Sequence, residues 1–253
     1  MQIRVVGCDG GVAPGKLTTC FQLSESLLID AGSICSGLDF NEQSKVRDII
    51  ISHTHLDHVR DLGFLADNML GEVDRVNIYA LSEVNRDLKK HFFNDRIWPD
   101  FTKIPTIQNP FYKLHDIEPE QKYEFGDLTV LAVRVDHAVT STGFILEDQD
   151  GAVIISGDTG PTERIWQVCK TYNNIKGYII ELAFPNSQQA IADAAKHFTP
   201  ATLKKELRKF SRNDIEIALY HLKPKYAAEI RNEIEVFENY SFKYLHNGEV
   251  LNY

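Results

Sequence analysis

The sequence predicts an α/β domain in which two β-sheets pack together and helices cover them on the outside. Two observations lead to this fold class: β-type runs follow one another from the N-terminus, and two well-marked helical patterns appear in the last quarter. The 253 residues are 43% hydrophobic and 25% charged, which suffices to bury a core. Length alone permits one large domain or two small ones. Without an internal repeat or a linker-like tract, we expect a single domain over 1–253.

The predicted elements are strands first and a mixture of strands and helices later. The strands are short apolar runs that Gly and Asp separate, and they cover residues 3–7, 19–24, 26–32, 48–52, 76–81, 128–135, 142–147, 152–157, 177–182 and 215–220. One helix begins at Thr199-Pro200, a cap residue followed by proline at the first helical position. Its apolar face contains Leu203, Leu207 and Phe210. A second helix follows Pro224, and its apolar face contains Ala227, Ile230, Ile234 and Phe237.

Charge, hydropathy and cysteine usage narrow the function classes. Lys and Arg number 27 against 36 Asp and Glu, for a net charge of −9, so the protein should repel folded RNA and anionic membranes. No apolar run approaches the roughly 18 residues of a membrane span, and the N-terminus MQIRVVGCDG lacks a signal-peptide core. The four cysteines form no CxxC pair, which favours reduced thiols. We therefore expect a cytoplasmic protein without a membrane partner.

The stretch ISHTHLDHVR is the strongest functional signal in the sequence. It sets His53, His55, Asp57 and His58 directly after an apolar run. Imidazole and carboxylate ligands without thiolate are typical of open hydrolytic sites for zinc, manganese or iron, whereas structural zinc sites favour cysteine. His53 and His55 can reach one ion while Asp57 and His58 face another.

Three further ligand-type residues each follow a predicted strand: His137, Asp158 and His221. Strand ends of this kind gather catalytic groups on one rim of an α/β fold. Taken singly, each residue has an ordinary structural interpretation, such as turn formation for Asp158. Together with the histidine-rich stretch they favour one metal centre. Two ions about 3.5–4 Å apart could share a water there, with the two oxygens of Asp158 bridging them.

These residues, in this order, resemble the metallo-β-lactamase superfamily, whose HxHxDH motif appears here as HTHLDH. The resemblance covers nearly the whole chain, including the opening segment GCDGGVAPGKLTTCFQLSESLLIDAG. It implies an αββα sandwich of two mixed β-sheets with outer helices. It also implies one metal bound by His53, His55 and His137, a second bound by Asp57, His58 and His221, and Asp158 between them.

Four stretches resemble one subfamily, the class II cyclic-nucleotide phosphodiesterases: SHTHLDHVRDLGFLADN, HFFNDRIWPDFTKIP, SGDTGPTERIW and ELAFPNSQQAIADAAKHFTP. The resemblance implies a dinuclear-metal phosphodiesterase that hydrolyses a 3′,5′-cyclic nucleotide to the 5′-nucleotide through a metal-bridging hydroxide. The expected cofactors are two divalent ions, zinc in the first place and manganese or iron as alternatives. The expected partner is a small anionic phosphodiester.

Catalysis and substrate binding are assigned to residues beside the metal ligands. His197, in the phosphodiesterase-like HFTP, is the predicted proton donor to the leaving ribose oxygen, and Glu181 is expected to orient it. His197 also lies near the helix that begins at Thr199, whose free N–H groups are expected to favour a phosphate. The alternative for His197 is a residue that only caps or packs this helix. Asp57 is expected to be catalytic as well as metal-binding. An insert at about 85–120 is expected to cover the site and to supply the substrate-binding residues His91, Asn94, Trp98 and Phe101.

Ribonuclease Z, which processes tRNA 3′ ends, is the main alternative, because IELAF is similar to its HEATF motif and KHFTP to its GHST motif. The histidine of HEATF is Ile180 here. Residues 85–120 carry six Lys or Arg and six Asp or Glu, so they make a poor tRNA clamp and no nucleic-acid partner is expected. Another hydrolase of the same fold is a further alternative, and a non-catalytic metal-binding module fits the complete ligand set least. The oligomeric state is open, a homodimer included.

Overall fold

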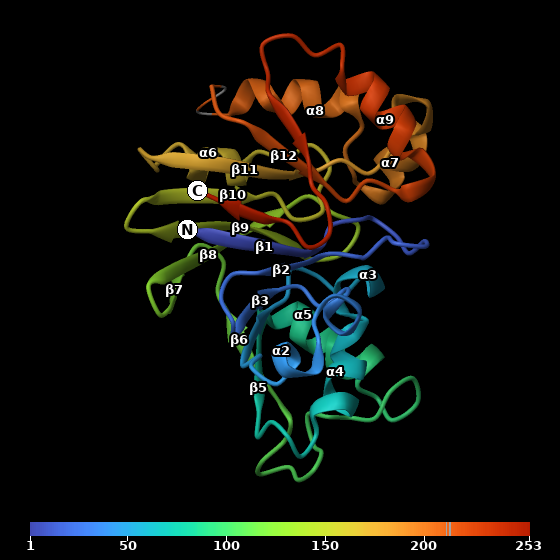
Figure 1. Cartoon of the computed structure of the whole chain (residues 1–253), viewed down its shortest axis with the longest axis vertical. Coiled ribbons are helices and arrows are strands. Elements are labelled where there is room, and N and C mark those ends of the chain that lie inside the picture. Colours follow the sequence, from blue (N-terminus) through green and yellow to red (C-terminus); the bar gives the residue numbers. More distant parts are fainter. Residues whose placement is uncertain (211, 213) are drawn as a thin grey trace.

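Two seven-stranded β-sheets form the centre of the computed structural model, which describes residues 1–210, 212 and 214–253 (Figure 1). In the order of hydrogen-bonded neighbours, the first sheet contains β14 (Val250–Asn252), β1 (Gln2–Gly7), β2 (Cys20–Gln22), β3 (Leu27–Ile29), β4 (Asp48–Ile50), β5 (Val76–Leu81) and β6 (Tyr112–Ile117). The second contains β13 (Phe242–Tyr244), β12 (Ile217–Tyr220), β11 (Ile175–Glu181), β10 (Gly151–Ile155), β9 (Ser141–Asp148), β8 (Leu128–Val135) and β7 (Lys122–Phe125). Strands β3 to β6 are parallel, as are β10 to β13, and the other pairs are antiparallel.

Helices cover the outer face of each sheet. The α-helices are α1 (Ile34–Gly37), α2 (Phe40–Gln43), α3 (Leu56–Val59), α4 (Asp61–Met69), α5 (Ser82–Asp87), α6 (Arg164–Cys169), α7 (Gln189–Ala195), α8 (Pro200–Glu206) and α9 (Ala227–Ile234). A π-helical turn, η1 (Leu88–Phe92), extends α5, and the 3₁₀ turns are η2 (Asn186–Gln188), η3 (Leu207–Lys209) and η4 (Pro224–Tyr226). Figure 1 shows α8 and α9 beyond the second sheet and α2 and α4 beyond the first. The αββα sandwich of two mixed sheets is confirmed.

Burial on both faces explains why the central strands are continuously apolar. Along β10, Val153 and Ile155 pack into the interior between the sheets, while Ala152 and Ile154 pack into a second cluster beneath the helices. That second cluster includes Trp166 of α6, which is 1% exposed. A strand covered on both faces cannot alternate between apolar and polar residues, because every side chain is inside.

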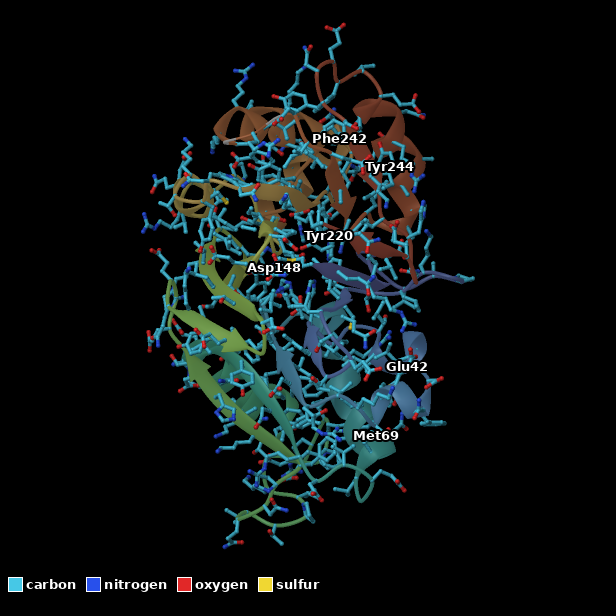
Figure 2. All side chains as sticks on the ribbon, turned by 60° about the vertical axis from the view of Figure 1, so that its left-hand side comes forward. Glu42, Met69, Asp148, Tyr220, Phe242 and Tyr244 are labelled. Carbon is cyan, nitrogen blue, oxygen red and sulfur yellow. The ribbon has the colours of Figure 1, made fainter. Side chains whose placement is uncertain are left out.

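Aromatic side chains join the two sheets. Tyr220, labelled in Figure 2 at the end of β12, lies edge-on to Phe21 of β2 with the ring centroids 5.4 Å apart. Both rings are buried in the interior between the sheets.

The two chain ends also meet, since the Met1 ammonium donates to the Tyr253 carbonyl at 2.6 Å. In the described residues, no helix is both long enough and apolar enough to cross a membrane.

Every predicted strand run contains a strand, and both predicted helices are present. The helix after Thr199 is α-helical only to Glu206 and continues as the 3₁₀ turn η3 to Lys209. The sequence did not indicate β6, β7, β13 and β14, and these are the strands at the four sheet edges. Edge strands have few buried positions, as in β7, where no residue is buried, so they lack the apolar run that marks the central ones.

Candidate metal centre

Strand ends from both sheets meet at one edge of the sandwich. Strands β8 and β10 both run antiparallel to β9 and therefore point the same way, and β12 points with them through parallel β11. Their C-terminal ends carry His137, Asp158 and His221. From the first sheet, β4 leads into the extended segment with His53, which is fully buried. Residues far apart in the sequence thus enclose one small volume, as the strand-end pattern predicted.

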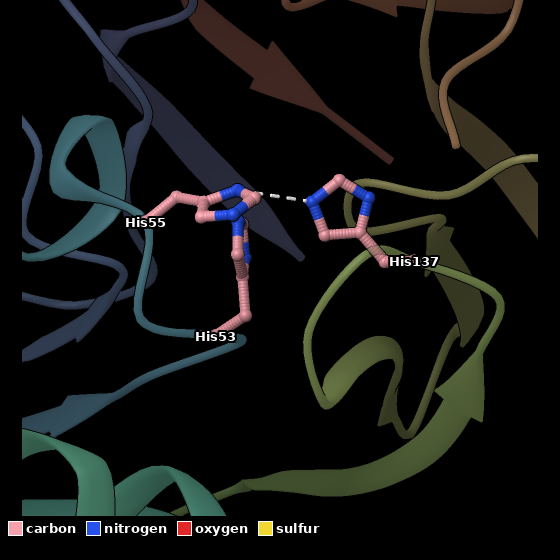
Figure 3. A group of neighbouring side chains, drawn as sticks. All are labelled: His53, His55 and His137. Carbon is pink, nitrogen blue, oxygen red and sulfur yellow. Dashed lines mark hydrogen bonds between the residues drawn. The ribbon is translucent and has the colours of Figure 1, made fainter. Parts of the chain in front are cut away.

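Three imidazoles form one side of this centre (Figure 3). The Nε2 atom of His137 lies 3.0 Å from Nδ1 of His55, and the ring of His53 lies 4.8 Å from that of His55 and 4.9 Å from that of His137. The carbonyl oxygen of Lys196 accepts a hydrogen bond from Nδ1 of His137 at 3.0 Å, which leaves the Nε2 lone pair for a cation. Burial lowers the pKa of His137 to about 4 and that of His53 well below its ordinary value. Both are therefore neutral at pH 7.

Asp158 is the centre of a second group. Its Oδ2 atom lies 3.1 Å from Nε2 of His221, 3.2 Å from Nε2 of His58 and 3.8 Å from Nε2 of His53. Asp57, on the first turn of α3, places Oδ2 3.2 Å from the same His221 nitrogen. Burial raises the pKa of Asp158, but the adjacent His221 and His58 outweigh burial and hold the pKa well below its usual range. Asp158 is therefore a carboxylate that faces both groups of histidines.

The unpaired atoms of this cluster fit a divalent metal. Buried side-chain atoms without a hydrogen-bond partner include Nε2 of His53, Nε2 of His58 and Oδ1 of Asp158. A buried polar atom that lacks a partner costs about 1–3 kcal/mol, so three of them in one place require compensation. Imidazole nitrogens and a carboxylate oxygen within 4.8 Å of one another are suitable ligands for zinc, manganese or iron. Divalent metal binding is what this arrangement supports.

A carboxylate that the sequence did not single out supports the cluster from behind. Asp30, buried after β3, places Oδ2 2.7 Å from Nδ1 of His58 and accepts hydrogen bonds from the N–H and hydroxyl of Ser52, both at 2.8 Å. It therefore fixes the His58 ring with Nε2 turned to the centre. The sequence contained a signal for Asp30, because it follows an apolar strand in LLIDAG as Asp158 follows β10.

Gly10 packs closely against the backbone and ring of His221. His221 adopts a left-handed backbone conformation with φ of +65°, and its N–H donates to the Cys8 carbonyl at 2.6 Å. Gly10 lies so close that a Cβ there would be 2.3 Å from the His221 carbonyl oxygen and 2.8 Å from its Nδ1. The glycine turn near the N-terminus is thus part of the wall that positions His221.

His197 and Glu181 form a buried pair on the rim of the cluster. Nδ1 of His197 lies 3.0 Å from Oε1 of Glu181, and the His197 ring stacks on that of His221 with a centroid distance of 5.2 Å. The same Glu181 oxygen accepts the backbone N–H groups of Thr159 and Phe198, so it joins three segments. Burial lowers the pKa of His197, but the charge and hydrogen bond of Glu181 outweigh burial and raise it. The predicted neighbourhood of His197 and Glu181 is observed.

The expectation that the helix after Thr199 offers free N–H groups is wrong. The Thr199 N–H donates to the Thr202 hydroxyl at 2.8 Å, and the Thr202 N–H donates to the Thr199 hydroxyl at 3.3 Å. The Ala201 N–H donates to Oδ1 of Asn186 at 2.8 Å, and Pro200 has no N–H. Each donor of the first turn is therefore occupied within the chain.

The four predicted substrate-binding residues lie in the insert, where the structure shows mainly packing contacts. Phe101 is 3% exposed in the core, so its ring has no free face for a base. Trp98 is half-buried and packs on Gly63 of α4 and on Phe64, at a centroid distance of 5.1 Å. The other two are His91, which is exposed, and Asn94, whose Oδ1 accepts the N–H groups of residues 96 and 97. The burial of Phe101 does not fit the predicted stacking role.

The fold and the His/Asp cluster together define a class of metal-dependent hydrolase. The model of the β-lactamase superfamily domain matches residues 27–235, and the chain belongs to the metallo-β-lactamase superfamily. The resemblance inferred from HTHLDH is thereby confirmed, as is the expectation of an enzyme.

Within this superfamily, one relative is the 3′,5′-cyclic-nucleotide phosphodiesterase of Aliivibrio fischeri. It is 30% identical over 268 residues, which cover 86% of this chain and 80% of the relative. The crystal structure of unliganded yeast PDE1 has a TM-score of 0.83 at 18% identity and covers 98% of each chain. A ribonuclease Z from Cyanothece sp. is 27% identical over 161 residues, covering 59% of this chain and 48% of that protein. By sequence, the Aliivibrio phosphodiesterase thus matches more of the chain than the Cyanothece ribonuclease Z does.

Proposed function

We propose that this protein is a dinuclear-metal phosphodiesterase that hydrolyses a 3′,5′-cyclic nucleotide to the 5′-nucleotide. The observation that carries the proposal is the similarity, over 86% of the chain, to a protein named for this reaction. The buried cluster supplies the chemistry that the reaction requires. The substrate is a small phosphodiester anion.

Two sets of ligands support two metal ions. His53, His55 and His137 would hold one ion, and a second set would hold the other: Asp57, His58 and His221. Asp158 would bind both, since its Oδ2 faces imidazoles of each set. When bound, divalent ions supply Lewis acidity for the phosphoryl oxygens and lower the pKa of water, and zinc is the first candidate, before manganese and iron.

His197 is the proposed proton donor in this reaction. Breaking the phosphodiester leaves an alkoxide on the ribose 3′ carbon, which needs a proton. Glu181 accepts the Nδ1 hydrogen of His197, so the opposite nitrogen, Nε2, is the one that can deliver a proton to the leaving oxygen. The stacking of His197 on His221 places this imidazole directly beside a proposed metal ligand.

Base recognition is assigned to Trp98. It is half-buried and packs on α4, the helix that directly follows the histidine motif. Base stacking on an aromatic ring contributes about 1–3 kcal/mol, whereas the metal ligands can hold only the phosphate. The buried Phe101 is excluded from this role.

A ribonuclease Z-like nuclease is the second candidate, because the Cyanothece ribonuclease Z matches more than half of this chain. Against it, Ile180 stands where the nuclease motif has histidine, and its side chain is fully buried in the cluster beneath the outer helices. Neighbouring residues of a strand point to opposite faces, so Glu181 reaches the centre while residue 180 points away. This chain therefore lacks, at the centre, the histidine that the ribonuclease Z motif has.

The test is hydrolysis by the purified protein with its metal content measured. Substrates are 3′,5′- and 2′,3′-cyclic nucleotides, bis(p-nitrophenyl) phosphate, a lactone and pre-tRNA. We expect turnover of a 3′,5′-cyclic nucleotide with weak salt dependence, because a mononucleotide makes few charge contacts. Efficient pre-tRNA cleavage with a steep salt slope would establish the nuclease instead, and metal binding without turnover of any substrate would indicate a non-catalytic module.

A further inference from the structure

A lysine stands on the rim of the metal centre. Lys223 lies between β12 and the turn η4, and its Nζ atom is 3.9 Å from Oδ2 of Asp57. The side chain is 27% exposed. Within residues 1–210, 212 and 214–253, no other Lys or Arg nitrogen lies within 4.0 Å of a carboxylate of Asp57, Asp158 or Glu181. Lys223 is therefore the lysine that faces the cluster.

The surroundings hold this ammonium toward the centre. The Lys223 backbone N–H donates to the Ala183 carbonyl at 3.3 Å, which attaches it to the segment after β11. Its Nζ atom lies 5.9 Å from the ring centroid of Phe184, a cation–π distance. The ring of Phe184 is 5.7 Å from that of His197. The Lys223 ammonium thus lies between Asp57 and the aromatic ring that supports the proposed proton donor.

The contacts of Lys223 differ from those of a structural lysine. Lys209, for comparison, donates to the Thr162 carbonyl at 2.9 Å and pairs with Glu163 at 2.7 Å. The 3.9 Å between Lys223 and Asp57 is too long for a hydrogen bond, and among the described residues its Nζ has no hydrogen-bond acceptor. The three N–H donors of Lys223 are therefore available to a ligand at the mouth of the centre.

We propose that Lys223 is a substrate-binding residue whose ammonium binds a non-bridging oxygen of the phosphodiester anion. The proposal deepens and rests on the phosphodiesterase function. The chain has a net charge of −9, and carboxylates surround the centre, so an approaching anion benefits from a fixed cation at the entrance. Lysine serves as a point charge for phosphate.

The test compares Lys223→Met with Lys223→Arg, which keeps the charge, and with Lys225→Met. Lys225 is exposed on the same turn, two residues away, and its Nζ lies over the ring of Tyr226, so it controls for loss of a lysine at this surface. For a cyclic nucleotide we expect Lys223→Met to raise KM about 10- to 100-fold, the worth of one hydrogen bond to a charged group. Lys225→Met should change KM by less than about twofold. Lys223→Arg should recover most of the loss, and all variants should keep their metal content.

Binding of inorganic phosphate to the metal-loaded proteins, followed by titration calorimetry, makes the test independent of turnover. Lys223→Met should weaken phosphate binding at least about tenfold while Lys225→Met should not. If the wild type hydrolyses no cyclic nucleotide, the proposed function fails, yet the calorimetry still decides the role of Lys223. Equal phosphate affinity in wild type and Lys223→Met, with metal content unchanged, would overturn the proposal. So would equal losses in Lys223→Met and Lys225→Met.

Discussion

The glycine turn beside His221 gives a prediction that the structure makes quantitative. We expect Gly10→Ala to destabilise the protein and weaken metal binding, whereas Gly11→Ala should do neither. A Cβ at Gly10 would lie 2.3 Å from the His221 carbonyl oxygen, where 3.4 Å is ordinary contact. At Gly11 the nearest atom to a Cβ is Cδ of Pro224 at 3.5 Å. The neighbouring glycine is therefore a matched control for the same substitution.

The loss of stability in Gly10→Ala can be estimated from the backbone segments that the added Cβ would push apart. The segment around Gly10 and that around His221 would have to separate by about 1 Å. Two backbone hydrogen bonds oppose this separation: His221 N–H to Cys8 at 2.6 Å and Gly10 N–H to Leu222 at 3.1 Å. Overpacking costs about 1–3 kcal/mol and a strained hydrogen bond about 1 kcal/mol, so we expect a loss of about 2–4 kcal/mol. At about 2–4 °C per kcal/mol for a chain of this size, Tm should fall by about 4–16 °C.

The assay is thermal denaturation of chelator-treated and metal-loaded protein, together with elemental analysis after dialysis. The chelator-treated samples report the packing defect alone. In the loaded samples, Gly10→Ala should also gain less Tm from metal, because metal ligands tolerate only about 0.2 Å of displacement. The reasoning is refuted if Gly10→Ala matches Gly11→Ala in both Tm and metal content.

The remaining predictions test the proposed catalytic and binding residues. His197→Ala should keep its metal content and lower kcat about 10²- to 10⁴-fold for a cyclic nucleotide, but much less for bis(p-nitrophenyl) phosphate, whose p-nitrophenolate leaves without a proton; equal losses on both substrates, or lost metal, would contradict proton donation. Asp158→Ala should lose one ion or most activity by elemental analysis and steady-state kinetics, because one carboxylate faces both sets of ligands; full activity with unchanged metal content would contradict the bridging role. Phe101→Ala should lower the free energy of unfolding in urea by about 3–5 kcal/mol, since the ring is 3% exposed, and should leave KM of the folded enzyme nearly unchanged. Trp98→Ala should raise KM for a cyclic nucleotide about 5- to 150-fold while barely changing bis(p-nitrophenyl) phosphate turnover; an unchanged KM would exclude Trp98 from base recognition.

The central strands and the residues that form the His/Asp cluster could be predicted from the sequence because both depend on local signals. A strand buried on both faces must be apolar throughout, as β10 is, and the ligands are recognisable by residue type at the ends of such strands. The pairing of His197 with Glu181 was also accessible, through motif resemblance rather than through periodicity. The four edge strands were not, because half-exposed strands lack an apolar run.

The tertiary structure alone decided which residues surround these ligands. Asp30 and His58 are separated by 28 positions, yet their side chains meet at 2.7 Å because β3 and β4 are adjacent parallel strands. Gly10 touches His221 because the N-terminal segment hydrogen-bonds to the residues after β12, a contact that no local pattern encodes. The insert shows why the substrate-binding prediction failed for Phe101, which is buried in the core. An aromatic residue looks the same in the sequence whether it lines a pocket or fills a core. Residue type specifies what a side chain can bind, but long-range packing determines which groups it meets.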